Sequence, residues 1–260
     1  MDKYKAKGGT VKIVRFAWQG ETRYGLVEGD VVYTVEGDPF GTLEQRERIG
    51  TLPEVRLLAP CAPTKIVAVG LNYADHAAEA HREIPTEPLI FLKPPSAVIG
   101  PGEKVAYPPI SQRVDYEAEL AVVIGRQVRN ISADEALNCL LGYTCGNDIT
   151  ARDLQRQDEQ WTRSKSFDTF CPLGPWIVTH LDPNDLSIEG RANGEARQRS
   201  RTRHMIFPVP QLIHFVAQVM TLQPGDVILT GTPAGVGPLQ RGDRVEVEIE
   251  GIGVLENRVV

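Results

Sequence analysis

The sequence predicts a strand-rich α+β protein with few helices. Apolar and polar residues alternate along many short segments, which is the pattern of half-buried β-strands. Glycines and prolines, 24 and 19 in number, separate these segments at turns. Helical periodicity is confined to a few stretches, and no internal repeat is present. A chain of 260 residues can bury a substantial core, as one large domain or as a main domain with a small appendage.

Composition and charge exclude several classes of protein. Hydrophobic residues make up 42% and charged residues 24%, which excludes disorder by composition. No apolar run approaches the ~18 residues of a membrane span, and the N-terminus lacks the apolar core of a secretory signal. We therefore expect a cytoplasmic protein without membrane association. The formal net charge of −6 argues against nucleic acid as a partner, and the four separated cysteines are expected to be reduced, buried thiols.

The N-terminal part of the chain predicts a tail followed by a small β unit. Residues 1–10 are polar and end in two glycines, so we expect a flexible tail there. Short alternating segments over residues 11–58, broken by glycines, predict a small antiparallel domain. Pro60 and Pro63 then mark a junction, after which residues 61–260 are expected to form the larger domain.

The middle of the chain predicts buried strands and two short helices. Residues 65–70 and 89–92 are apolar runs of strand length, and residues 116–124 are the clearest strand in the sequence. Residues 132–135 form a capping box that predicts a short helix, with Leu140 and Leu141 on its apolar side. Residues 150–153 could open another helix in the same way.

The last third of the chain predicts one amphipathic helix followed by strands. Residues 210–222 have apolar residues at helical spacing, and Pro224-Gly225 is expected to stop this helix. The final strands are expected at residues 227–229, 244–249 and 253–260.

Two glutamates on the clearest strand predict a cation site. Because side chains alternate along a strand, Glu117 and Glu119 lie on one face, about 6–7 Å apart along the chain. Buried there, they would repel each other and lose hydration unless a cation or a proton intervened. All-oxygen ligation suits Mg²⁺, Mn²⁺ or Ca²⁺. The alternative is a solvent-exposed edge strand, which is how we interpret Glu246 and Glu248.

Asp148 is the natural third ligand of this predicted site. It follows an apolar stretch and precedes the predicted helix at residue 150, a position at which carboxylates often face a ligand-binding crevice. A plain helix-capping role is an equally good interpretation of the same residue from its position alone.

Several separated motifs resemble those of the fumarylacetoacetate hydrolase family. The resemblance covers about residues 61–260, and residues 11–58 resemble the small N-terminal domain of the shorter bacterial members. The segments that carry it occur in the family's order and are DYEAEL at 115–120, GNDITARDLQ at 146–155, SKSFD at 164–168 and GTPAGVG at 231–237, with upstream segments at 70–79 and 91–94.

The resemblance implies a fold, a cofactor and a set of site residues. The fold is a mixed β-sandwich roll with a small N-terminal β domain, in a chain that forms a homodimer. The cofactor is Mg²⁺ or Mn²⁺, with Ca²⁺ as a possible substitute, and the substrate is a small anionic keto acid. The family's positions fall on metal ligands Glu117, Glu119 and Asp148, on catalytic residues His76, Glu79 and Lys165, and on substrate contacts Gln155 and Thr232, with Arg152 and Lys93 of the same motifs as further contacts.

These residues suggest a division of labour on a substrate with a pyruvoyl end. The cation would chelate its carboxylate and 2-oxo group and stabilise an enolate, and Lys165 would add a second positive charge. Glu79 would orient His76 while His76 takes a proton from water, on a segment over residues 72–87 that is expected to act as a lid. The alternatives are a solvated lysine and a surface His–Glu pair.

Three functions are compatible with this set of residues. The first is an acylpyruvate-type hydrolase that cleaves a C–C bond in a 2,4-dioxo acid. The second is a decarboxylase or isomerase of keto diacids, such as oxaloacetate or the 2-hydroxyhepta-2,4-diene-1,7-dioate of aromatic catabolism. Residues 167–176 resemble members assigned to homoprotocatechuate breakdown, which supports this second function. The third is a catalytically silent dimer with a structural cation. The residues do not choose the substrate, or Mg²⁺ over Mn²⁺.

Overall fold

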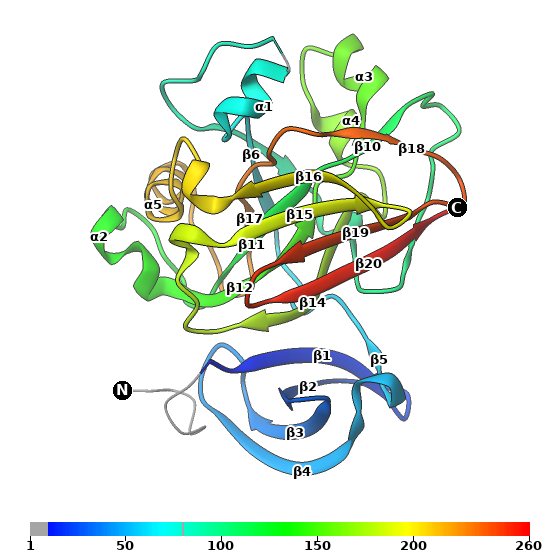
Figure 1. Cartoon of the computed structure of the whole chain (residues 1–260). Coiled ribbons are helices and arrows are strands. Elements are labelled where there is room, and N and C mark those ends of the chain that lie inside the picture. The colour runs from blue at the N-terminus through cyan, green and yellow to red at the C-terminus, as the bar shows by residue number, and fades with distance from the viewer. Residues whose placement is uncertain (1–9, 80) are drawn as a thin grey trace.

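The computed structural model describes residues 10–79 and 81–260 of the chain, shown in Figure 1. The tail predicted at residues 1–10 lies outside the described residues, apart from Thr10. Strands dominate the described part, in a twelve-stranded, a five-stranded and a three-stranded sheet, with a few short helices. The predicted strand-rich α+β class is therefore confirmed.

The N-terminal strands form a curved antiparallel unit that continues the largest sheet. Each strand from β1 to β4 pairs with the next, and β5 pairs with β1. Strand β1 also pairs with β14 (Cys171–Val178), where Ile13 lies opposite Ile177, so this unit, at the bottom of Figure 1, is joined to the rest by main-chain pairing. The domain boundary near residue 60 stays a prediction. The N-terminal strands are β1 (Lys12–Trp18), β2 (Glu21–Glu28), β3 (Val31–Gly37), β4 (Leu43–Thr51) and β5 (Arg56–Leu57).

The remainder of the large sheet is mixed in direction. From β14 the order runs β12, β11, β17, β6 and β7; the β17–β6 pair is parallel, and the other pairs along this path are antiparallel. The short β8 (Val98–Ile99) pairs with β14 in parallel. These strands span β12 (Leu140–Asn147), β11 (Ala118–Ile124), β17 (Val227–Leu229), β6 (Ile66–Gly70) and β7 (Leu89–Lys93).

The five-stranded sheet packs against the large sheet as the second layer of a sandwich (Figure 1). A separate three-stranded sheet holds β13, β10 and β18. The five-stranded sheet comprises β16 (Glu195–Arg201), β15 (Ser187–Ala192), β19 (Arg244–Ile249), β20 (Gly253–Val259) and β9 (Lys104–Val105), and the three-stranded sheet comprises β13 (Thr150–Ala151), β10 (Val114–Tyr116) and β18 (Gly237–Leu239).

Strand β11 lies at the centre of the core, with every residue buried. Leu120 and Val122 pack in one apolar cluster with Val247 of the five-stranded sheet. Ala121 and Val123, on the other face, belong to a cluster that includes residues of the N-terminal strands. Both faces of this strand are therefore buried. In β19 the valines are buried while Glu248 is exposed, as expected for a strand with one solvent-facing side.

The helices are short and lie around the sheets. The apolar face of α5 is buried, which confirms the predicted amphipathic helix, but the helix ends at Val219 because Met220 is extended. No helix in the described ranges is long and apolar enough to cross a membrane. The helices are α1 (Ala74–Glu79), α2 (Ala133–Ala136), α3 (Arg152–Gln157), α4 (Thr162–Lys165) and α5 (Val209–Val219), and the 3₁₀ turns are η1 (Leu52–Glu54), η2 (Pro95–Ala97), η3 (Leu137–Cys139), η4 (Pro183–Asp185) and η5 (Thr202–His204).

Two local helix predictions were wrong in detail. The predicted helix from residue 133 stops at Ala136, and Leu140 and Leu141 belong to β12, because pairing of Leu140 with Ile124 of β11 outweighs the helical spacing. The hydroxyl of Thr150 does not cap α3. It donates to the Asp148 carbonyl at 2.9 Å, and Thr150 begins the short strand β13.

Candidate active site

Glu117 occupies the point where the chain leaves one sheet for another. Strand β10 ends at Tyr116 and pairs within the small sheet, whereas β11 begins at Ala118 in the large one. In this gap the Glu117 N–H donates to Oδ1 of Asn147 at 2.9 Å, and its carbonyl accepts from the Asp148 N–H at 2.9 Å. The backbone of Glu117 is therefore fixed although the residue belongs to neither strand.

Strand register brings the three predicted metal ligands together. Strands β11 and β12 pair so that Ala118 lies opposite Asn147, which places Asp148 beside Glu117 and Glu119. Ligand oxygens of the three carboxylates all lie within 4.8 Å of one another, and all three residues are buried. The structure therefore places them in one cluster, away from the exposed-edge alternative for the two glutamates.

Two of these carboxylates have cationic partners. Lys165 Nζ lies 2.9 Å from Glu117 Oε2 and also bonds Oδ2 of Asp148. Arg152 pairs with the other oxygen of Glu117. Burial raises the pKa of Glu117, but the charges of Lys165 and Arg152 outweigh burial and hold its pKa below the ordinary value. Burial alone would lower the pKa of Lys165; Asp148 and Glu117 raise it, so its ammonium stays charged.

Lys93 lies behind this cluster. Its Nζ donates to Asp148 Oδ1 at 2.5 Å and to the Ile149 carbonyl at 3.2 Å, and the residue is 1% exposed. Because these contacts hold Asp148 in place, the structure favours a positioning role for Lys93. Its predicted contact with substrate stays a prediction.

Glu119 has no cationic partner among residues 10–79 and 81–260. Its one hydrogen bond among the described residues comes from the Gly231 N–H, at 2.6 Å. Burial and the negative charges of Asp148 and Glu117 raise the pKa of Glu119 well above its ordinary value. Gly231 has φ +95°, and a Cβ there would lie 2.6 Å from Cβ of Asn72, so only glycine allows this approach.

The donor set fits a hard divalent cation. Three buried carboxylates supply only oxygen ligands, and the uncompensated charge of Glu119 is what a bound cation would neutralise. The cluster could therefore hold a metal ion, and its oxygen ligands suit Mg²⁺ or Mn²⁺ rather than a soft metal ion that prefers thiolate ligands.

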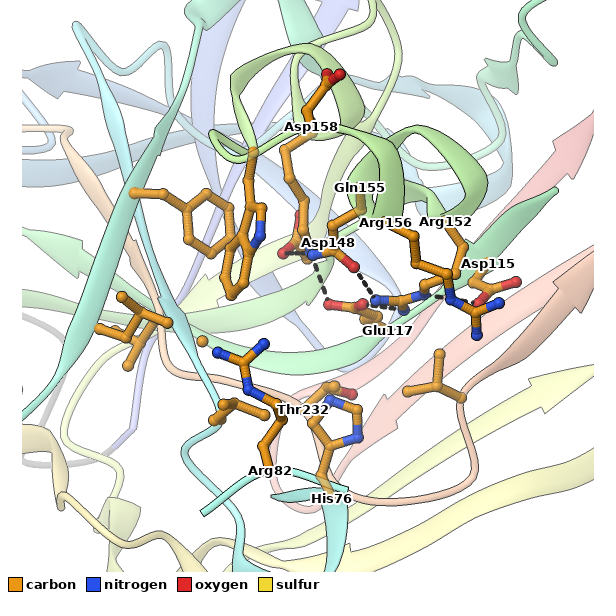
Figure 2. A pocket seen from close by; sticks show the side chains of 18 of the residues that line it. His76, Arg82, Asp115, Glu117, Asp148, Arg152, Gln155, Arg156, Asp158 and Thr232 are labelled. Atoms are coloured by element: carbon orange, nitrogen blue, oxygen red, sulfur yellow. Dashed lines mark hydrogen bonds and ion pairs between the residues drawn. The ribbon is translucent and has the colours of Figure 1, made fainter. Parts of the chain in front are cut away.

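A cavity of about 970 Å³ opens above the carboxylate cluster (Figure 2). Several separate parts of the chain line it, namely the end of β6, α1 and its following turn, β7, the β10–β11 segment, the segment around α3 and α4, and the loop after β17. Of the ten predicted site residues, Lys93 alone is absent from its wall; those present are His76, Glu79, Glu117, Glu119, Asp148, Arg152, Gln155, Lys165 and Thr232.

His76 and Glu79 form a pair at the mouth of this cavity. Both belong to α1, and His76 Nδ1 lies 3.3 Å from Glu79 Oε2. Glu79 also accepts from the Gly235 N–H at 3.0 Å, so the glycine-rich loop holds the carboxylate that faces the imidazole. With Nδ1 directed at Glu79, Nε2 is the ring nitrogen left to exchange a proton.

The predicted substrate contacts already have partners within the protein. Arg152 donates to Gln155 Oε1 at 2.5 Å and to Asp115 at 2.9 Å. The Thr232 hydroxyl donates to the Ala118 carbonyl at 2.8 Å and accepts from the Gln198 amide at 2.8 Å. Contacts of Gln155, Thr232 and Arg152 with substrate stay predictions.

Some residues of the site escaped the sequence analysis. Phe91 and Trp161 pack edge to face, with ring centroids 5.3 Å apart, and form an apolar wall of the cavity. Gln198 is fully buried and also bonds the Ala118 N–H and the Pro233 carbonyl. The sequence analysis missed these residues because both sets of contacts join residues that lie far apart in the sequence.

Comparison with known proteins gives a consistent picture. Residues 65–260 match the family model described as fumarylacetoacetate (FAA) hydrolase C-terminal, and residues 11–60 match a model described as Rv2993c-like, N-terminal. The oxaloacetate tautomerase FAHD2A, mitochondrial, of Bos taurus is 49% identical over 220 residues, covering 80% of this chain and 70% of the relative.

Two solved structures are similar over nearly the whole chain. The 2-hydroxyhepta-2,4-diene-1,7-dioate isomerase from Mycobacterium marinum is 45% identical, with a TM-score of 0.90 and coverage of 96% of this chain and 98% of the other. The fumarylacetoacetate hydrolase from Exiguobacterium antarcticum is 39% identical, with a TM-score of 0.87 and coverage of 96% and 99%.

Proposed function

Because this chain belongs to the fumarylacetoacetate hydrolase family, we propose that it is a divalent-metal-dependent enzyme that forms the enolate of a 2-oxo carboxylic acid. We place keto–enol tautomerisation or double-bond isomerisation of a 2-oxo acid first among its reactions. The observation that carries this proposal is the buried Glu117, Glu119 and Asp148 cluster, which lies in one cavity with the His76–Glu79 pair.

Two of the relatives support proton transfer as the reaction. An oxaloacetate tautomerase and a 2-hydroxyhepta-2,4-diene-1,7-dioate isomerase are 49% and 45% identical to this chain. Tautomerisation requires a proton to leave C3 and return to another position, with no bond to water. His76, oriented by Glu79 and facing the cavity, is suited to carry that proton.

The cation would supply Lewis-acid stabilisation of the negative charge that develops on the 2-oxo oxygen. Lys165 would add a positive charge beside Glu117 and Asp148. The aromatic pair of Phe91 and Trp161 would exclude water from one side of the substrate. Mg²⁺ or Mn²⁺ as the cation and a homodimer as the assembly are parts of the same proposal.

C–C bond hydrolysis is the second candidate. The His76–Glu79 pair has the arrangement of a general base with an orienting carboxylate, which could equally activate a water molecule. In that reaction water adds to the C4 carbonyl, the C3–C4 bond breaks, and the electron pair remains on the pyruvate enolate.

Product analysis separates the two candidates. We would incubate the Mg²⁺-loaded enzyme with acetylpyruvate and follow both enol absorbance and pyruvate release, the latter by coupling to lactate dehydrogenase. Tautomerisation predicts faster keto–enol equilibration without pyruvate. Stoichiometric release of pyruvate and acetate would favour the hydrolase. If neither faster keto–enol equilibration nor pyruvate release is observed with this and other 2-oxo acids, the proposed function is overturned.

A further inference from the structure

Two arginines line the cavity without a partner in the described part of the chain. Arg113 and Arg152, the other arginines of the wall, are paired with Asp115. Arg82 and Arg156 have exposed side chains for which the structure shows neither a hydrogen bond nor an ion pair. An unpaired guanidinium at a cavity mouth is a recognition element for an anion, because it offers a planar set of donors.

The backbone of Arg82 is fixed although its side chain is free. The Arg82 N–H donates to the Ala77 carbonyl at 2.9 Å, and the His81 N–H donates to the Ala78 carbonyl at 3.1 Å. His81 has φ +52°, and this pair of bonds has the pattern of a Schellman motif that ends a helix. Arg82 is therefore held in a defined position relative to His76 and Glu79 of α1.

The two free arginines approach from different sides of the cavity. Figure 2 shows Arg82 and His76 coming from the α1 side, with Glu117 and Asp148 across the cavity from them. Arg156 follows Arg152 by four residues in α3, so it lies on the same side as the ion pairs around Asp115. Arg82 therefore faces the carboxylate cluster across the cavity, whereas Arg156 lies beside the ion pairs of Asp115.

We propose that Arg82 binds the distal carboxylate of a dicarboxylic 2-oxo acid and so makes this site selective for diacids over monoacids. The inference rests on the proposed function, which anchors the 2-oxo end at the carboxylate cluster. A monoacid would leave the guanidinium without a partner, whereas a diacid forms a charge-assisted contact at the same position. Arg82 is thus a specificity-determining residue that acts on the far end of the substrate.

Calorimetric titration of the Mn²⁺-loaded full chain tests this inference without requiring turnover. The ligands are 2-oxoglutarate and 2-oxopentanoate, which share a five-carbon 2-oxo acid and differ in the distal carboxylate. We expect the wild-type chain to bind the diacid about tenfold more tightly, a typical gain for one charged contact. Arg82→Gln should remove this preference by weakening only diacid binding, and Arg82→Lys should restore part of it.

Arg156→Gln is the matched control, because it removes the same charge from the same cavity. It should keep the preference for the diacid. An unchanged preference in Arg82→Gln, or its loss in Arg156→Gln, would overturn the role of Arg82 while leaving the proposed function intact. Failure of both ligands to bind the wild-type chain would overturn the proposed function and this inference together.

Discussion

Glu119 is the residue whose surroundings make least sense without a ligand. The carboxylates of Glu117 and Asp148 face lysines, but within the described part of the chain the Glu119 carboxylate has only the Gly231 N–H. A carboxyl whose pKa is raised in the folded state destabilises the fold at neutral pH, because the unfolded chain releases its proton more easily. The loss of folding stability that Glu119 causes therefore indicates that this carboxylate has a function, such as binding a cation.

Replacing Glu119 with glutamine should stabilise the metal-free protein. At pH 7 the unfolded carboxyl is ionised and the folded one resists ionisation, so Glu119→Gln removes a penalty and should raise Tm by about 2–4 °C for each kcal/mol recovered. As pH falls toward the unfolded pKa of about 4.3, both states become protonated and the difference should shrink. Thermal unfolding in EDTA at several pH values measures this.

Metal addition and an exposed glutamate provide the controls for this variant. Mn²⁺ at a hundredfold excess over Kd should increase the free energy of unfolding of the wild-type protein by about 2.7 kcal/mol and so raise its Tm. It should have little effect on Glu119→Gln. Glu248→Gln, at a half-exposed side chain of β19, should leave Tm nearly unchanged. A lower Tm for metal-free Glu119→Gln would contradict our description of this carboxylate.

At the scale of residues, the sequence predicted which residues form the carboxylate cluster better than it predicted the contacts around them. The period of a strand and the family resemblance located Glu117, Glu119 and Asp148. They could not show that Glu119 lacks a cation, or that Lys93 holds Asp148, because both facts depend on contacts between residues far apart in the chain. Arg82 carried no sequence signal, because its proposed role rests on the absence of a side-chain partner among the residues that the structure describes.

At the scale of elements, the glycine-rich loop after β17 connects both halves of the site. Its Gly231 N–H binds Glu119 and its Gly235 N–H binds Glu79, so one loop touches the carboxylate cluster and the His–Glu pair. Gly235 has φ +97°, and a Cβ there would lie 2.1 Å from the Arg197 carbonyl oxygen. The loop has this course because glycine alone is compatible with it.

Gly235→Ala should therefore displace the loop and release Glu79. We expect a loss of stability of about 1–3 kcal/mol from backbone strain and a fall in kcat, because His76 loses its oriented partner. Gly242→Ala is the matched control, since Gly242 has φ +96° but no atom within 4 Å of the added Cβ. Activity equal to wild type in Gly235→Ala, measured on acetylpyruvate, would show that this loop does not position Glu79 for catalysis.

Helices and strands were predicted correctly where the period of the apolar residues matched their burial, and wrongly where pairing with a neighbouring strand determined the structure. Strand β11 was predictable because residues 120–124 form an apolar run of strand length, and α5 because its apolar face is continuous. Leu140 and Leu141 match a helix in spacing but belong to β12, because β12 pairs with the neighbouring strand β11, where Leu140 lies opposite Ile124. The spacing of apolar residues in the sequence does not show whether strand pairing or a helix is more stable.

For the whole molecule, one apolar cluster joins the N-terminal strands to the catalytic part. Ile13, Leu26 and Leu43 lie in the same buried cluster as Ala121 and Ile177. Strand β1 adds main-chain pairing with β14. The small N-terminal unit is thus part of the support of the strands that carry the carboxylate cluster, a connection that its sequence pattern alone did not predict.

Destabilising the N-terminal unit should therefore destabilise the entire protein. Ile13→Ala, at a fully buried position, should cost about 2–5 kcal/mol and lower the single Tm of the chain. Val219→Ala, at a position 54% exposed, should have a small effect. Calorimetry of the full chain measures both. Two separate transitions, with only the smaller one shifted by Ile13→Ala, would show that the units unfold independently.

Deuterium exchange at C3 of a 2-oxo acid tests metal-assisted enolate formation most directly, because all the candidate reactions pass through an enolate. The measurement is the rate at which 2-oxobutanoate loses its C3 protons in D₂O, followed by NMR with and without Mg²⁺. We predict exchange well above the enzyme-free rate that requires Mg²⁺ and is lost in Glu119→Gln. Exchange by the wild-type enzyme that is independent of metal, or that survives in Glu119→Gln, would contradict the account.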